Sequence, residues 1–175
     1  MKKVALLTCL LALAISAGAQ TLNLASLPAT LTPTQVPNGF GGFQWTGADY
    51  VSPAWSGANR GFRLGPDADD VIFGGGPICR TEPIACEMSI SSNFEFKAMS
   101  AQLASAQTSA STSQIVVTAY LNGTFVGSQQ YTLSSASMSK IVFPASWGLV
   151  TELVIHPKAG SEFVLYGLHT AGPIV

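Results

Sequence analysis

The stretch QIVVTAYLNGTFVGSQQYTL, residues 114–133, predicts a β-hairpin. Alternating runs flank Asn122-Gly123, and this dipeptide is the strongest short hairpin signal because a type I′ turn requires positive φ at both central residues. A two-residue loop places Tyr120 opposite Phe125 on one face of the hairpin. We expect the other face to point into the core, and it carries Ile115, Val117, Ala119, Leu121 and Val126.

Six further segments around this hairpin have the composition of strands, and no stretch holds a helical period. They are residues 42–45, 70–73, 94–103, 140–143, 150–156 and 162–169. We expect residues 150–156 and 162–169 to form neighbouring central strands. The fold predicted is all-β, a single β-sandwich of about eight antiparallel strands with jelly-roll-like topology.

The first 19 residues have the features of a secretory signal peptide. Lys2 and Lys3 precede an apolar run over 4–16, and Ala17-Gly18-Ala19 is a small-x-small cleavage site. The run is shorter than the about 20 residues that span a bilayer. We therefore expect a secreted, extracellular protein without a membrane anchor. An extended segment, 20–35, would then lead into the β-sandwich domain, 36–175.

The charge of the chain excludes one class of partner. It has eight Lys and Arg against nine Asp and Glu, and the basic residues are scattered. Nucleic-acid binding relies on clustered basic side chains that release counterions, so we expect no nucleic-acid partner.

Cys79 and Cys86 are the cysteines that remain after signal cleavage. In an oxidising compartment an isolated pair indicates one disulfide. Closing this short loop would stabilise the fold by about 2.5 kcal/mol. A redox dithiol usually has two residues between its cysteines, and a metal site needs more ligands than this segment offers.

Two short motifs leave alternatives open. Asp67, Asp69 and Asp70 are typical of a polar turn before a strand, and a structural calcium ion is the alternative; no other cofactor is expected. Asn122 begins an Asn-Gly-Thr sequon at the predicted hairpin tip, which indicates N-glycosylation, although the residue also suits the turn by itself.

No catalytic motif stands out. His156 and His169 each fall at the end of a predicted strand, and no Gly-x-Ser-x-Gly sequence accompanies them. The few glutamates offer no marked pair for glycoside hydrolysis. We predict a protein that is not an enzyme.

Aromatic residues in 41–55 pose the main functional question. Phe43 and Trp45 alternate on a predicted strand and should be buried. Tyr50 and Trp55 follow in a predicted loop, where a ring could stack on a sugar, and Trp147 is a second loop tryptophan. The alternative is that Trp55 folds back as a lid. The full set of candidate ligand-binding residues is Tyr50, Trp55, Asn59, Arg60, Arg63 and Trp147.

The motifs GGFQW, SGANRGF, DVIFGG, FEF, AYLNG, TELVIHP and FVLYGLH occur in an order that resembles a loose group of secreted fungal and bacterial proteins without assigned function. The resemblance covers about residues 36–170, and CRTEPIAC and Tyr166-Gly167 depart from it. It implies a jelly-roll-like β-sandwich similar to carbohydrate-binding modules, without catalytic residues.

These observations favour a secreted, non-catalytic binding module for an extracellular polysaccharide. The main alternative is a structural or protein-interaction factor that contacts a surface protein. A glycoside-active enzyme is a third hypothesis. The oligomeric state is left open at this stage.

Overall fold

The computed structural model describes residues 18–55, 60–65, 70–74, 87–106, 112–158 and 161–172. These residues form eleven strands: β1 Ala19–Thr21, β2 Thr34–Gln35, β3 Gln44–Thr46, β4 Ala48–Val51, β5 Val71–Gly74, β6 Met88–Ser105, β7 Thr112–Leu121, β8 Thr124–Ser134, β9 Ser139–Val142, β10 Val150–Pro157 and β11 Phe163–Ala171. Short 3-10 helices connect some of them: η1 Leu24–Ser26, η2 Phe40–Gly42, η3 Arg60–Arg63 and η6 Ala145–Trp147. No helix among the described residues is long and apolar enough to cross a membrane.

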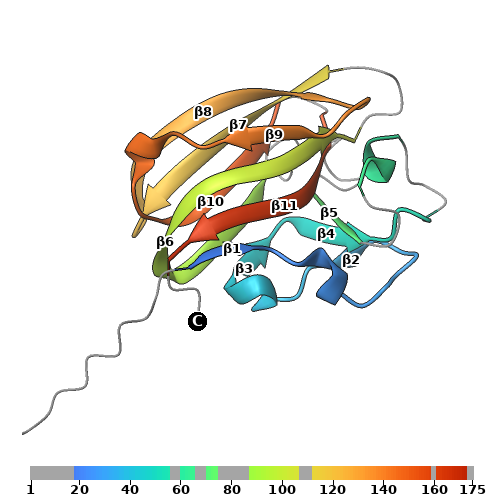
Figure 1. The fold of residues 1–175 in the computed structure, drawn as a ribbon, viewed down its shortest axis with the longest axis horizontal. Coiled ribbons are helices and arrows are strands. Elements are labelled where there is room, and N and C mark those ends of the chain that lie inside the picture. The colour runs from blue at the N-terminus through green and yellow to red at the C-terminus, as the bar shows by residue number, and fades with distance from the viewer. Residues whose placement is uncertain are drawn as a thin grey trace, which may run out of the picture.

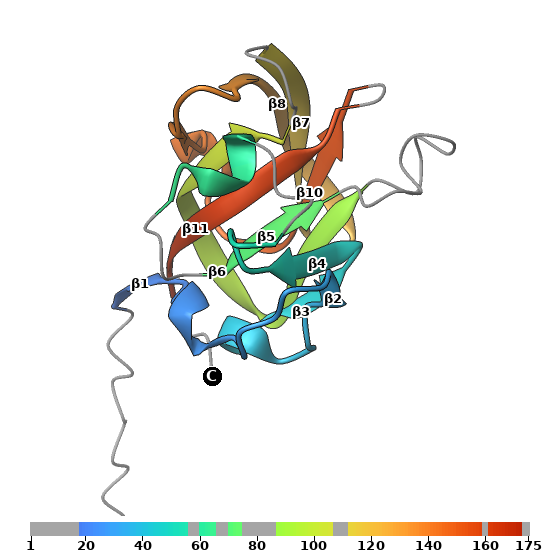
Figure 2. The same ribbon diagram turned by 90° about the vertical axis from the view of Figure 1, so that its right-hand side faces the viewer.

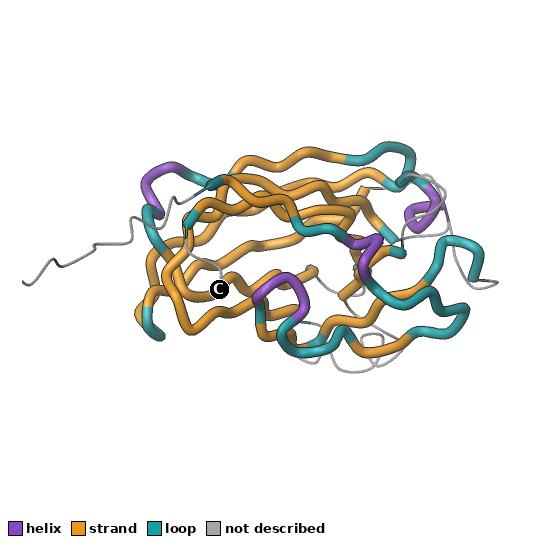
Figure 3. Tube along the Cα trace, turned by 60° about the horizontal axis from the view of Figure 1, so that its bottom comes forward, coloured by secondary structure: helices purple, strands orange, loops and turns teal. Residues whose placement is uncertain are grey.

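The strands form one open antiparallel sheet in the order β2-β4-β5-β11-β6-β10-β7-β8. β1 pairs with β11, and both β3 and β9 pair with β6. β7 and β8 lie at the top of Figures 1 and 2, and the short strands β1, β2 and β3 lie at the bottom. In Figure 3 the strands run side by side along the length of the molecule.

The long strand β6 joins two parts of this sheet. Its first half pairs with β10 and β3, and its second half pairs with β11 and β9. Between the halves, β6 advances from Ser91 to Phe96 while β10 advances only from Glu152 to Val150. Such a bulge bends the strand, and here it redirects the chain from one set of partners to the other.

A single apolar cluster is shared by both parts of the sheet. Ile90 and Ile115 contribute to it from one part, and Leu103 and Leu165 contribute from the other. The N-terminal segment joins the same cluster through Leu22, Leu24 and Leu27, whereas the described residues 28–35 are exposed or half-buried.

The part built from β4, β5 and β11 is buried on both faces. Ile72 points into the main cluster, whereas its neighbours Val71 and Phe73 join a second cluster with Phe62 and Trp55. Successive residues of a strand point to opposite faces, so the unbroken apolar run VIF matches a strand that is covered on both sides.

The structure confirms the hairpin turn and the two pairs beside it. Leu121 lies opposite Thr124 and Tyr120 opposite Phe125. Asn122 and Gly123 have φ of 50° and 77°, as a type I′ turn requires.

Beyond these pairs, a bulge at Val126 places Ala119 opposite Gly127. Of the residues expected on the core face, Ile115, Val117 and Ala119 are buried, but Leu121 and Val126 are only half-buried.

Two other predictions are revised. The residues 150–156 and 162–169 lie in β10 and β11, which are not neighbours because β6 runs between them. About eight strands were expected, and β1, β2 and β4 are additional in the described residues. Each of these three is at most four residues long, too short to leave a periodic pattern in the sequence.

Candidate ligand-binding face

One face of β3, β6, β10, β7 and β8 consists of exposed or half-buried residues. The register places Glu152 opposite both Ser91 and Tyr120, and Val154 opposite Ser89 and Thr118. Paired residues share a face, so these side chains lie in rows across the strands. We call this surface the open face; it comprises Gln44, Thr46, Glu87, Ser89, Ser91, Val116, Thr118, Tyr120, Phe125, Ser128, Gln130, Glu152, Val154 and His156.

An aromatic pair lies at one end of the open face. The rings of Tyr120 and Phe125 meet edge to face with centroids 6.3 Å apart. Phe125 is 60% exposed, because its strand β8 is the last of the sheet. The turn beside this pair is tied to β10, since the Asn122 N–H donates to Thr151 Oγ1 at 2.8 Å. The pair therefore offers an apolar surface on a well-anchored part of the hairpin.

Two carboxylates lie on the open face, each with a polar partner. Ser89 Oγ donates to Glu152 Oε1 at 2.5 Å, and Glu87 Oε1 lies 2.9 Å from His156 Nδ1. Because a carboxylate only accepts, Nδ1 must carry a proton, which leaves Nε2 as the ring nitrogen for a ligand. Both side chains of the second pair are partly exposed, at 38% for His156 and 47% for Glu87.

A shallow hollow of about 560 Å³ lies over these groups. It is lined by Glu87, Val116, Thr118, Tyr120, Glu152, Val154 and His156. Its volume is in the range of about 300–1,000 Å³ that is typical of ligand sites, and its lining combines a ring, hydroxyls and two carboxylates. The open face can therefore bind a polar ligand that has both hydroxyl groups and apolar patches.

A smaller cavity of about 310 Å³ lies between the N-terminal segment, η2 and β11. Its lining has no charged residue, and the Ser26 hydroxyl there already donates to the Asn23 carbonyl oxygen at 2.8 Å. Thr21 Oγ1 beside it is within 2.9 Å of His169 Nδ1. The open face, with two carboxylates and an aromatic pair, is therefore the better candidate for a ligand-binding site.

The aromatic residues predicted as a sugar platform lie elsewhere. Phe43 and Trp45 are buried, as expected. Tyr50 is only 5% exposed in β4, and Trp147 is 7% exposed and stacked on Phe143 with centroids 5.7 Å apart. Trp55 packs edge-on against Phe62 in the second cluster, which is the lid arrangement. Burial leaves Tyr50 and Trp147 no exposed ring face for a sugar.

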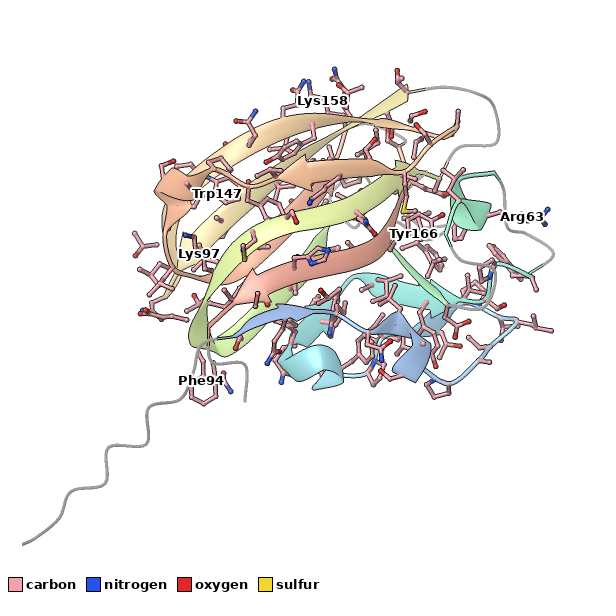
Figure 4. The ribbon with its side chains drawn as sticks, in the orientation of Figure 1. Arg63, Phe94, Lys97, Trp147, Lys158 and Tyr166 are labelled. Carbon is pink, nitrogen blue, oxygen red and sulfur yellow. The ribbon has the colours of Figure 1, made fainter. Side chains whose placement is uncertain are left out.

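Of the loop residues predicted to accompany those rings, Arg63 lies far from Trp147. Arg60 begins η3, and Arg63 ends it with an exposed side chain. Figure 4 shows Arg63 and Trp147 at opposite ends of the molecule. Asn59 lies outside the described residues.

The loop that carries η3 is fastened by Tyr166. The Tyr166 hydroxyl donates to the Gly61 carbonyl oxygen and accepts from the Leu64 N–H at 3.2 Å. Burial raises the pKa of Tyr166 to about 12. This hydroxyl therefore stays protonated and holds the loop as a cover on β4, β5 and β11.

The structure describes only some residues of the predicted calcium, disulfide and glycosylation sites. Asp70 is buried directly before β5, whereas Asp67, Asp69, Cys79 and Cys86 lie outside the described residues. Among the described residues no group of three or more His, Cys, Asp or Glu is arranged for a metal ion. Calcium binding, the disulfide and glycosylation of the exposed Asn122 stay predictions.

Together, the fold and the open face define an all-β protein with an exposed antiparallel sheet surface. No family model matches the chain, and no curated protein is similar to it in sequence. Its structure is similar to that of a DUF4465 family protein from Bacteroides caccae, with a TM-score of 0.55, 11% sequence identity, and coverage of 90% of this chain and 94% of that chain. At this identity the likeness shows the all-β fold alone, shared over nearly the whole of both chains.

The sequence did carry a signal for the open face. Glu152, Val154 and His156 alternate with apolar residues in TELVIHP, which places all three on one side of a strand. Their partners Glu87 and Ser89 are more than 60 residues away along the chain, so only the strand register brings them together.

Proposed function

We propose that this protein is a secreted, non-catalytic binding module for an extracellular carbohydrate, and that the sugar lies across the open face. The two parts of the sheet, packed on one apolar cluster, would correspond to the layers of a jelly-roll-like β-sandwich. The all-β fold supports this proposal by analogy with other β-sandwich binding modules, and the open face supplies its site.

The observation that carries the proposal is the aromatic pair beside two carboxylates. A sugar ring has an apolar side formed by C–H groups, which packs on aromatic faces such as those of Tyr120 and Phe125. Its hydroxyls donate to carboxylates, which accept strongly, and Glu152 and Glu87 lie on the same face. The hydroxyl of Thr118 lines the same hollow and can both donate and accept.

A glycoside-active enzyme is the weaker hypothesis, because no catalytic motif marks these two carboxylates as a pair. Ser89 Oγ donates to Glu152 Oε1, and Glu87 Oε1 lies beside His156 Nδ1, so each carboxylate already has a polar partner on the open face. Glycosidases need two carboxyl groups that flank the scissile bond as general acid and as base or nucleophile.

Secretion is part of the same proposal. The signal sequence supports it, and β1 begins at Ala19, so cleavage after Ala19 would leave Gln20 and Thr21 in place beside β11. Mass spectrometry of the protein collected from the medium should give a chain that begins at Gln20. Retention of residues 1–19 in a cell-associated protein would contradict secretion.

The experiment that tests binding is a pull-down of purified protein on insoluble chitin, cellulose, β-glucan and xylan. Tyr120→Ala and Glu152→Gln each remove one group from the open face, and Arg63→Ala, which removes an exposed charged side chain away from that face, is the control. Retention on one polysaccharide, lost in both open-face variants and kept in Arg63→Ala, would support the proposal. Far-ultraviolet circular dichroism confirms that each variant is folded.

Other outcomes have equally definite meanings. Loss of retention in Arg63→Ala alone would move the site to the loop of η3. Loss only after addition of a chelator would indicate calcium at the Asp67, Asp69 and Asp70 segment. Retention on none of the four polysaccharides would contradict carbohydrate binding and favour a structural or protein-interaction factor, the alternative for which β8 provides a specific surface.

A further inference from the structure

β8 is an unusually long and uncharged edge strand. It pairs with β7 along one side and stands at the end of the strand order. Its eleven residues include neither a charged residue nor a proline. Ser128, Gln129 and Gln130 are all exposed, although successive residues of a strand point to opposite faces. An edge of this kind presents a row of backbone N–H and C=O groups to which another strand can pair.

The other described edges of the sheet are short or protected. β1 and β3 have three residues each, and β2 has two residues and lies between Pro33 and Pro37. β9 has four residues, includes Lys140 and is followed by Pro144. Short length, lysine and proline are the usual devices against edge-to-edge pairing. β8 has only one bulge, at Val126, and its pairing with β7 is regular from Gly127 to Ser134.

We propose that β8 pairs antiparallel with β8 of a second copy of this chain, about a two-fold axis at Gln130. Directly opposite residues of an antiparallel pair share a face, so the axis must pass through a residue. Gln130 and Tyr131 lie at the middle of the bulge-free stretch 127–134, and we place the axis at Gln130 because the Tyr131 hydroxyl is already bonded to the Val142 carbonyl oxygen. In this register Ser128 lies opposite Thr132 of the second copy, and Gln129 lies opposite Tyr131 of the second copy.

The chemistry of this edge fits a second copy. A two-fold axis sets each residue at the axis against itself, which repels when that residue is charged. Gln130 is neutral, and its amide both donates and accepts, so two such amides can bond reciprocally. An isologous contact of this kind closes as a dimer. It would join two open faces into one continuous surface, which would raise avidity for any repetitive ligand.

Analytical ultracentrifugation of the purified protein, up to about 1 mM, tests the proposal, because one strand pair makes a small interface of modest affinity. Gln130→Lys and Gln130→Glu should each be monomeric, since like charges then meet at the axis. An equimolar mixture of the two should dimerise about tenfold more tightly than either alone. Gln114→Lys is the matched control, because Gln114 lies opposite Thr132 on the same face but on β7.

The recovery in the mixture separates edge pairing from misfolding, because a misfolded chain is not restored by mixing. A wild-type protein that is monomeric throughout the concentration range would overturn the proposal. So would a dimer that survives in both Gln130 variants, or one that Gln114→Lys weakens as much as Gln130→Lys. Failure of polysaccharide binding leaves this inference intact, since it rests on β8 alone.

Discussion

The contact between β8 and η6 gives a sharp test of the packing. The Trp147 ring is buried, stacks on Phe143 at 22° and lies against Gly127. A methyl group added at Gly127 would be 2.6 Å from Trp147 Nε1 and 3.0 Å from its Cδ1. Real side-chain carbons do not approach this closely, so Gly127→Ala must displace a ring that the core holds in place.

The magnitudes follow from two opposing effects. Overpacking a well-filled core costs about 1–3 kcal/mol. Alanine in place of glycine within a strand regains about 0.5–1 kcal/mol of backbone entropy. The difference predicts that Gly127→Ala lowers the free energy of unfolding by about 1 kcal/mol, and by at most about 2.5 kcal/mol. Trp147→Ala should lower it by about 3–5 kcal/mol, because it leaves a cavity beside Phe143.

The double variant, Gly127→Ala with Trp147→Ala, tests whether the Trp147 ring is the cause of the destabilisation by Gly127→Ala. With Trp147 already truncated, the methyl group meets no ring, so Gly127→Ala should become neutral or stabilise the protein by about 0.5 kcal/mol. Urea unfolding followed by circular dichroism measures all four proteins, with a constant denaturant slope as the check on two-state behaviour. Gly167→Ala is the control, because the nearest atom to its added methyl would be Gln102 Oε1 at 3.7 Å. Equal costs of Gly127→Ala in both backgrounds would refute the reasoning.

Three further predictions concern single hydrogen bonds and the hairpin turn. Burial raises the pKa of Tyr166 to about 12, whereas a phenol in the unfolded chain has a pKa of about 10, so the unfolded chain loses this proton first. The free energy of unfolding should therefore fall as the pH rises from about 10 to 12. Tyr166→Phe should cost about 1 kcal/mol at neutral pH and make this fall smaller, and the remainder includes Tyr131, whose pKa burial also raises. A flat profile for the wild-type protein would contradict it. Trp45→Phe removes the Nε1–H bond to the Phe40 carbonyl oxygen, 2.9 Å long, and should cost about 1–3 kcal/mol in thermal unfolding. Asn122→Ala should lower the free energy of unfolding by about 1 kcal/mol, because Asn122 has φ of 50°, which alanine adopts unfavourably. Asn122→Gly should leave it almost unchanged, since glycine suits this turn position, and it also abolishes any glycosylation. Equal destabilisation in the two variants would argue against the backbone conformation of the turn as the cause.

Local pattern accounts for much of the fold. The alternation around Asn122-Gly123 was sufficient to predict the hairpin turn and the Tyr120–Phe125 pair, which the structure confirms, but it did not predict the bulge at Val126 that shifts the register beyond this pair. The burial of Phe43 and Trp45 likewise followed from their alternation. These features depend on residues a few positions apart, for which strand geometry leaves few alternatives.

Pairing between distant strands needed the tertiary structure. The alternation of apolar and polar residues indicates which face of a strand is buried, but it does not indicate which strand lies beside it. Hence β10 and β11 were expected to be neighbours, whereas the bend in β6 separates them. Trp55 and Trp147 had equivalent loop contexts in the sequence, yet one closes a second cluster and the other packs against Gly127.

By itself, the sequence determined that the chain is all-β, where its clearest strands run and which face of the hairpin is apolar. Only the tertiary structure decided that Ser89 meets Glu152 and that Glu87 meets His156, and therefore where a ligand-binding face can be. The physical reason is that the register between strands far apart in sequence depends on the bend in β6 and on the packing of the whole core. Neither can be predicted from a local sequence pattern.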